Sequence, residues 1–192
     1  MPFSFRITKS LMTENTLLAH DHSELDDAPA GLLSALSEGD AARSLEGLDC
    51  FWARLAVHIR AENFHLFPAL LCAIERRDES TSPAGEPKTD EVQTLIARLR
   101  ENHDFFMTEL AAAVKQLRGL CKCAQPGGIG EVREKIDAVS RRLEVHNALE
   151  ESQAYGWVSV LLDPREQVAS HGKIRWELKN LPARFRKSDA DV

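Results

Sequence analysis

The chain has 192 residues, of which 43% are hydrophobic and 28% charged, so it can bury one sizeable core and is too short to need a second. Its formal net charge of −6 argues against nucleic-acid binding as the main function, because phosphate binding requires a basic surface. It has no apolar run long enough to span a membrane and no signal-like segment near its N-terminus, so we expect a cytoplasmic protein that does not bind membranes.

Apolar residues recur at helical spacing in four long segments, and no segment alternates as a strand would. The first predicted helix covers residues 7–37, with a kink or break at Pro29, which lacks the N–H that an interior turn needs. Residues 38–40 (Glu-Gly-Asp) then provide a stop and a cap. The second predicted helix covers residues 41–76, and Pro68 should bend it near its end.

Two further helices are predicted over residues 89–121 and 131–162. Residues 77–88 form a polar loop before the third helix, and residues 124–130, rich in Gly, separate the third from the fourth. Helices of roughly 30 residues with short connections are typical of antiparallel up-down bundles. We therefore expect an all-α fold in which residues 1–162 form an antiparallel up-down four-helix bundle.

The composition changes in the last part of the chain, residues 163–192. Residues 164–187 contain seven Lys or Arg and two Glu, with Trp176 and Phe185 among them. We expect this basic C-terminal extension to form a short fifth helix docked on the bundle. Its charge leaves open a second role, as the binding segment for a protein partner.

The four cysteines give weak signals. Cys50 and Cys72 fall within the second predicted helix, where we expect small buried side chains. Cys121 and Cys123 form a C-x-C pair beside a loop, and such a pair alone is weak evidence for a metal or redox site. In a reducing cytosol we expect all of these thiols to stay free.

One histidine interrupts the apolar stripe of each predicted helix. In the second and fourth helices a glutamate follows four residues later, and side chains at this spacing lie about 40° apart around an α-helix. A single histidine on an apolar face is usually a hydrogen-bonded core residue. Four of them together with two carboxylates favour a metal, because an unpaired buried carboxylate is strongly unfavourable. The six candidate ligands are His22, His58, Glu62, His103, His146 and Glu150.

This donor set also indicates the kind of metal. It contains imidazole and carboxylate but no thiolate, which disfavours a structural zinc site of the cysteine kind and suits iron or manganese, with zinc possible. Two carboxylates that face each other across a bundle can bridge two ions. Two ions that share six side chains keep positions open for solvent or an exogenous ligand. The residues alone leave open whether one or two ions bind per chain.

These candidate ligands lie in four short sequence motifs along the chain. They are His22, His58-x-x-x-Glu62 followed by Leu66-Phe67-Pro68, Glu101-Asn102-His103, and His146-x-x-x-Glu150-Glu151. Together they resemble the hemerythrin-like (HHE cation-binding) domain family over roughly residues 11–162. The resemblance implies a four-helix bundle with a non-haem di-iron centre, two bridging carboxylates, and chemistry with dioxygen or a related small oxidant.

The chain departs from the oxygen-carrying members of that family. They have a second histidine one turn along the third helix, where this chain has Met107, and a thioether is a poor ligand for oxidised iron, which argues against reversible oxygen transport. They also place the fourth-helix carboxylate five residues after its histidine, which would select Glu151, whereas the spacing of the second helix favours Glu150. We expect His65 to line the pocket or to replace the missing histidine as a ligand. We expect Tyr155 in the core, with tuning of a nearby iron as the alternative.

Three functions fit these features. The first is an iron protein that reacts with or senses dioxygen, nitric oxide or peroxide, and that is an oxidoreductase if it turns the oxidant over. The second is a module that stores or delivers iron, or repairs iron centres, without turnover. The third is a metal-free helical protein that binds a partner through its basic extension. The open coordination positions favour the first, and the residues do not select the small molecule.

Overall fold

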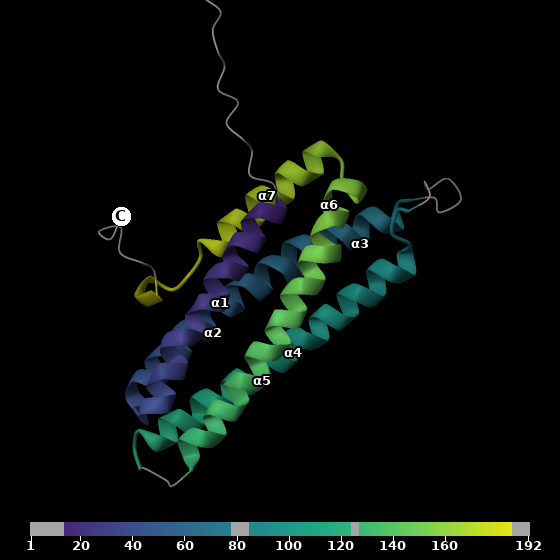
Figure 1. Ribbon diagram of the computed structural model, residues 1–192. Helices are drawn as coiled ribbons and strands as arrows, with labels where there is room; N and C mark the ends of the chain where they lie inside the picture. Colours follow the sequence, from purple (N-terminus) through teal and green to yellow (C-terminus); the bar gives the residue numbers. More distant parts are fainter. Residues whose placement is uncertain (1–13, 78–84, 124–126, 186–192) are drawn as a thin grey trace, which may run out of the picture.

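The computed structural model describes residues 14–77, 85–123 and 127–185, and the secondary structure of these residues is helical (Figure 1). Four long rods come first, and a shorter helix follows. The second and fourth rods each contain a π-helix, in which the backbone hydrogen bonds join residues five apart. The rods are α1 (Glu14–Glu38); α2 (Ala41–Ala61), η1 (Glu62–Leu66) and α3 (Phe67–Glu75); α4 (Thr89–Leu120); and α5 (Gly128–Leu149), η3 (Glu150–Ala154) and α6 (Tyr155–Leu161).

The chain reverses between α1 and α2 at the predicted stop and cap. Gly39 has a φ of 76°, a left-handed conformation that glycine adopts without a steric penalty. The Asp40 side chain accepts hydrogen bonds from the backbone N–H groups of Ala42 and Arg43, at 3.1 and 3.0 Å. These bonds satisfy two donors that the first turn of a helix leaves unpaired.

α1 continues through Pro29, so the predicted break there is wrong. Packing against α2 supports the helix on both sides of this residue. Gly47 of α2 allows the close approach, because a Cβ atom at that position would lie 3.4 Å from the Cβ of Leu32. The missing N–H of Pro29 therefore removes one hydrogen bond without ending the helix. Residues 7–13, which the prediction assigned to the same helix, lie outside the described residues.

The rods pack as two neighbouring pairs, α1 with α2 and α4 with α5, and the pairs contact each other through α2 with α4 and α1 with α5 (Figure 1). In the described part of the chain, no helix is long and apolar enough to cross a membrane.

The hydrophobic core is divided into two clusters along the rods. One cluster joins the start of α1 to α3, α6 and the first half of α4, and it includes Leu66, Leu70 and Ile96. The other joins the rest of α1 to α2, α5 and the second half of α4, and it includes Phe51 and Leu110. Between the two clusters lies a layer of buried polar side chains, and every rod contributes to it.

The predicted fifth helix is present as α7 (Pro164–Leu178), and a short 3₁₀ turn, η4 (Ala183–Phe185), follows it. Asp163 caps α7 by accepting hydrogen bonds from the N–H groups of its first turn. The helix docks on α2 and η1. There Glu177, 3% exposed, lies with Oε1 2.9 Å from Nη2 of Arg60. Residues 186–192 of the basic extension lie outside the described residues.

The cysteines are all free. Cys50 is partly buried, but Cys72, Cys121 and Cys123 are exposed, so the expectation that Cys72 is buried is wrong. Cys72 follows η1 in the second rod. A π-turn contains one residue more than an α-turn, so it rotates the residues after it by about 100° relative to an unbroken α-helix.

Candidate metal centre

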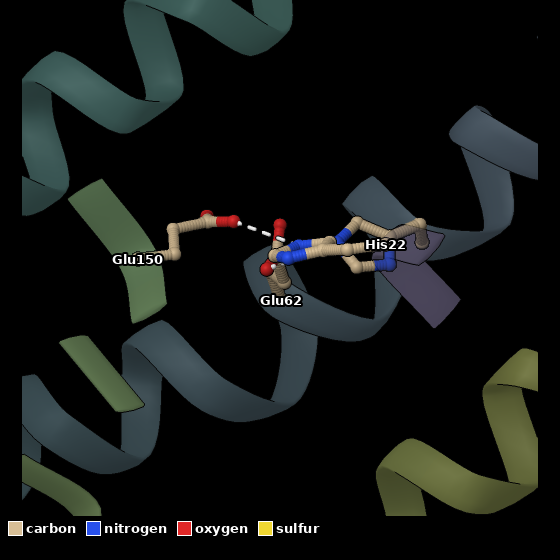
Figure 2. Close-up of side chains that lie close together, drawn as sticks. His22, Glu62 and Glu150 are labelled. Atoms are coloured by element: carbon tan, nitrogen blue, oxygen red, sulfur yellow. Dashed lines mark hydrogen bonds and ion pairs between the residues drawn. The ribbon is translucent and has the colours of Figure 1, made fainter. Parts of the chain in front are cut away.

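The polar layer contains the six side chains that the sequence predicts as ligands. None is more than 2% exposed. Figure 2 shows three of them, His22 from α1, Glu62 from η1 and Glu150 from η3, pointing toward one another from separate rods. His58 of α2, His103 of α4 and His146 of α5 complete the set. Residues separated by up to 128 positions in the sequence therefore meet in one buried layer.

The six side chains form two groups that share both glutamates. His22 and His58 lie with Glu62 and Glu150 in the first group, which we call site 1. His103 and His146 lie with the same two glutamates in the second group, which we call site 2. Within each group the candidate ligand atoms lie within 4.8 Å of one another. Each group could hold one metal ion, and each glutamate could then bridge the two ions.

Both shared glutamates begin a π-helix. Glu62 opens η1 and Glu150 opens η3, and in each case the carbonyl of the glutamate accepts a hydrogen bond from the N–H five residues on, at Phe67 and Tyr155. In an α-helix, side chains five apart point about 140° away from each other, but one π-turn brings them to the same side. The aromatic side chains of Phe67 and Tyr155 therefore face the polar layer alongside the glutamates.

Tyr155 is buried, as the sequence predicts, and its hydroxyl group also lies within site 1. Its hydroxyl oxygen lies 2.9 Å from His22 Nε2, 3.0 Å from Glu62 Oε1 and 3.3 Å from Glu150 Oε2. Burial, together with the negative charges of Glu150 and Glu62, raises the pKa of Tyr155 well above 10. The phenol is therefore neutral and donates its single proton within site 1. The five-residue spacing from Glu150 carries no signal unless the π-helix is known.

Phe67 occupies the corresponding place next to site 2. Its ring stacks on the imidazole of His103, with ring centroids 5.7 Å apart and an angle of 10° between the planes. Since a phenyl ring has no polar atom, site 2 is lined by hydrocarbon where site 1 has a hydroxyl group.

The two histidines of site 1 each contact a carboxylate on the side away from the centre. His22 Nδ1 lies 2.9 Å from Glu151 Oε1, and His58 Nδ1 lies 2.7 Å from Asp21 Oδ2. An ionised carboxylate can only accept, so each Nδ1–H donates and each Nε2 keeps its lone pair. The two Nε2 atoms are only 3.1 Å apart. Two lone pairs that face each other at this distance require a positive charge, either a proton or a metal ion.

Two carboxylate oxygens in the layer are also poorly satisfied. Glu62 Oε2 lies 3.3 Å from His103 Nε2, and Glu150 Oε1 lies 3.1 Å from His146 Nε2. Neither oxygen has a hydrogen-bond partner among the described residues, and both residues are 0% exposed. A buried carboxylate oxygen without a partner is strongly unfavourable. A cation between the carboxylates and the imidazoles would remove this penalty, so the donor set fits a metal.

The protonation of the layer shows the same need for positive charge. Burial alone would lower the pKa of His58, but the Glu62 carboxylate and the hydrogen bond to Asp21 outweigh burial and raise that pKa well above 6.5. Burial also opposes protonation of His22, yet the neighbouring Glu150 carboxylate raises its pKa. Burial would raise the pKa of Glu62, and the charge on His58 instead holds it well below 4.5. In the metal-free protein, protons therefore supply the charge that a metal would supply.

Three further residues from the sequence prediction lie outside both groups. His65 has its Nε2 3.8 Å from Glu177 Oε2 of α7, because η1 rotates it away from the direction of Glu62. Glu151 is 47% exposed and contacts the outer nitrogen of His22, whereas Glu150 faces the centre. Met107 accepts a hydrogen bond at its Sδ from Trp52 Nε1 at 3.3 Å. It lies against the second hydrophobic cluster.

Comparison with protein-family models, curated proteins and solved structures gives no match. The evidence for a metal centre is therefore the geometry of the six side chains and their outer contacts. Imidazole and carboxylate donors without thiolate suit iron, manganese or zinc. Four protein donors per ion leave coordination positions open to solvent or to a small ligand.

Proposed function

We propose that this protein is a hemerythrin-like four-helix bundle that holds two non-haem iron ions, one in site 1 and one in site 2, and that the centre reacts with or senses dioxygen, nitric oxide or peroxide. The observation that carries the proposal is the sharing of Glu62 and Glu150 by two buried groups of donors. Two carboxylates between two pairs of imidazoles are the arrangement that a pair of bridged divalent ions requires.

The chain has a defined part in this function. The carboxylates of Glu62 and Glu150 neutralise positive charge in a layer from which water is excluded, and four imidazoles hold the outer positions. Iron would supply the redox chemistry with the oxidant. Tyr155 places a neutral hydrogen-bond donor inside site 1. Phe67 leaves the side of site 2 apolar, which suits a small uncharged molecule such as dioxygen or nitric oxide.

The test is the metal content and optical spectrum of the full-length protein produced with sufficient iron. We expect about two irons per chain and, after oxidation, near-ultraviolet charge-transfer bands that change when peroxide or nitric oxide is added. Bound iron with a spectrum that none of these molecules alters would favour storage or delivery of iron over reaction with an oxidant. Protein that folds normally, is colourless and binds no metal would refute the proposal.

A matched pair of variants separates the centre from the rest of α1. His22→Ala removes a donor of site 1 and should lower the iron content, whereas His20→Ala removes an exposed imidazole two residues earlier on the same helix and should leave it unchanged. Equal iron content in both variants would show that His22 is not a ligand.

A further inference from the structure

Sites 1 and 2 each combine two imidazoles with the two shared carboxylates, but their imidazoles have different hydrogen-bond partners on the side away from the centre. In site 1, both imidazoles donate Nδ1–H to a carboxylate, His22 to Glu151 and His58 to Asp21. Such a contact fixes the ring orientation and makes Nε2 a stronger base and a stronger metal ligand. Both Nε2 atoms of site 1 are therefore ready to bind a metal without a change of tautomer.

In site 2, the outer contact of His146 has the opposite polarity. Arg142 Nε donates to Asn102 Oδ1 at 2.7 Å, which fixes the amide so that its Nδ2 faces His146 Nδ1 at 3.3 Å. An amide nitrogen donates, so Nδ1 of His146 accepts and its proton lies on Nε2. That nitrogen faces Glu150 and is the one a metal must use. Metal binding at Nε2 therefore requires the other tautomer of His146, and it loses the hydrogen bond from Asn102.

The other imidazole of site 2 has no outer support. His103 is 2% exposed, and its Nδ1 has no hydrogen-bond partner in the described part of the chain. His103 Nε2 lies 3.2 Å from His146 Nε2, so it accepts from the proton there and already carries its own proton on the unpartnered Nδ1. Neither imidazole of site 2 thus has the outer carboxylate that strengthens both ligands of site 1.

We propose that the two sites are unequal and fill in order: site 1 binds its ion first and tightly, site 2 binds its ion second and loosely, and Asp21 and Glu151 are the positioning residues that set this order. The proposal rests on the function proposed above and adds to it a stable form with one ion per chain. Removing an outer partner of a metal-bound imidazole typically weakens binding about 10- to 100-fold. Two supported imidazoles in site 1 and none in site 2 lead us to expect a difference of at least about 10-fold between the first and second dissociation constants.

The experiment is a calorimetric titration of the metal-free, full-length protein with Fe²⁺ in the absence of oxygen. We expect two binding events that differ at least about 10-fold in dissociation constant. Asp21→Ala and Glu151→Ala should each weaken the first event by about 10- to 100-fold and narrow the gap between the events. Asp26→Ala is the matched control. Asp26 lies on the same helix and carries the same charge, but it accepts a hydrogen bond from Asn147 rather than from an imidazole.

A variant that should strengthen metal binding tests site 2. Asn102→Asp supplies a carboxylate that can accept from His146 Nδ1–H and from Arg142 together. It should tighten the second event by about 10- to 100-fold and leave the first unchanged. A residue with a purely structural role would not move the two events separately.

The outcomes distinguish this proposal from the proposed function. Two events of equal affinity would overturn the order of filling and leave the di-iron function standing, whereas no binding in either site would overturn the function. If Asp26→Ala and Asp21→Ala weakened the first binding event equally, the negative charge rather than the hydrogen bond to the imidazole would set the affinity. That result would also overturn the proposed order of filling. Glu151 is 47% exposed, so Glu151→Ala is informative even if Asp21→Ala does not fold.

Discussion

Replacing Tyr155 with Phe tests whether the hydroxyl group stabilises the polar layer. The change keeps the buried ring and removes one oxygen, which lies 2.9 to 3.3 Å from an imidazole nitrogen and two carboxylate oxygens. Its single proton can satisfy one acceptor at a time. A hydrogen bond to a charged group contributes about 1.5 to 3 kcal/mol, so Tyr155→Phe should lower the free energy of unfolding of the metal-free protein by that amount.

The assay is urea unfolding at pH 7, followed by circular dichroism. With a slope of about 2 kcal/mol per molar urea, the midpoint should fall by about 1 M. Ser152→Ala is the control, because it removes an exposed hydroxyl from the same rod and should change the stability by less than about 0.5 kcal/mol. In the iron-loaded protein, Tyr155→Phe should keep the iron content, since it removes none of the six donors. A midpoint equal to or above that of the unaltered protein would refute the view that the phenol satisfies the buried carboxylates.

Two further predictions follow from charges in and near the layer. The raised pKa of His58 stabilises the folded protein fully below about pH 6.5, and this stability is lost as the pH rises through the folded-state pKa. The lowered pKa of Glu62 stabilises it fully above about pH 4.5, and this stability is lost as the pH falls through the folded-state pKa of that carboxyl group. Urea unfolding of the metal-free protein from pH 4 to pH 9 should therefore give a free energy of unfolding that is constant between about pH 4.5 and pH 6.5 and falls at higher pH. A free energy of unfolding that rises steadily toward pH 9 would contradict this. Glu177→Gln should weaken the docking of α7 by about 0.5 to 1 kcal/mol, since its partner Arg60 is half exposed, and should speed tryptic cleavage within α7. Unchanged cleavage would show that other contacts hold the helix.

The helices and the six candidate ligands could be predicted because they follow α-helical spacing. His58 and Glu62, four residues apart, end on one face, and so do His146 and Glu150. The cap at Asp40 was likewise readable from a local pattern. Each of these features depends on residues within one or two turns of each other.

What could not be predicted depends on the two π-helices and on contacts between distant segments. An added residue per turn brings Tyr155 into site 1 and takes His65 toward α7, and no local sequence rule places such a turn. The contact of Asp21 with His58 also could not be predicted from the pattern of a single helix, because it joins two helices. Asp21 precedes His22 in the sequence, but its carboxylate reaches the imidazole of the neighbouring rod.

The division of the core into two hydrophobic clusters has a consequence for how the protein opens. Every long rod contributes to both clusters, and the layer between them contains buried ionisable side chains in place of hydrocarbon. In the absence of metal, we expect the two ends to behave as two cooperative units in amide hydrogen exchange. Ions ligated by all four rods would tie the two ends into a single unit. Iron in this layer would then act as a mechanical link as well as a chemical centre.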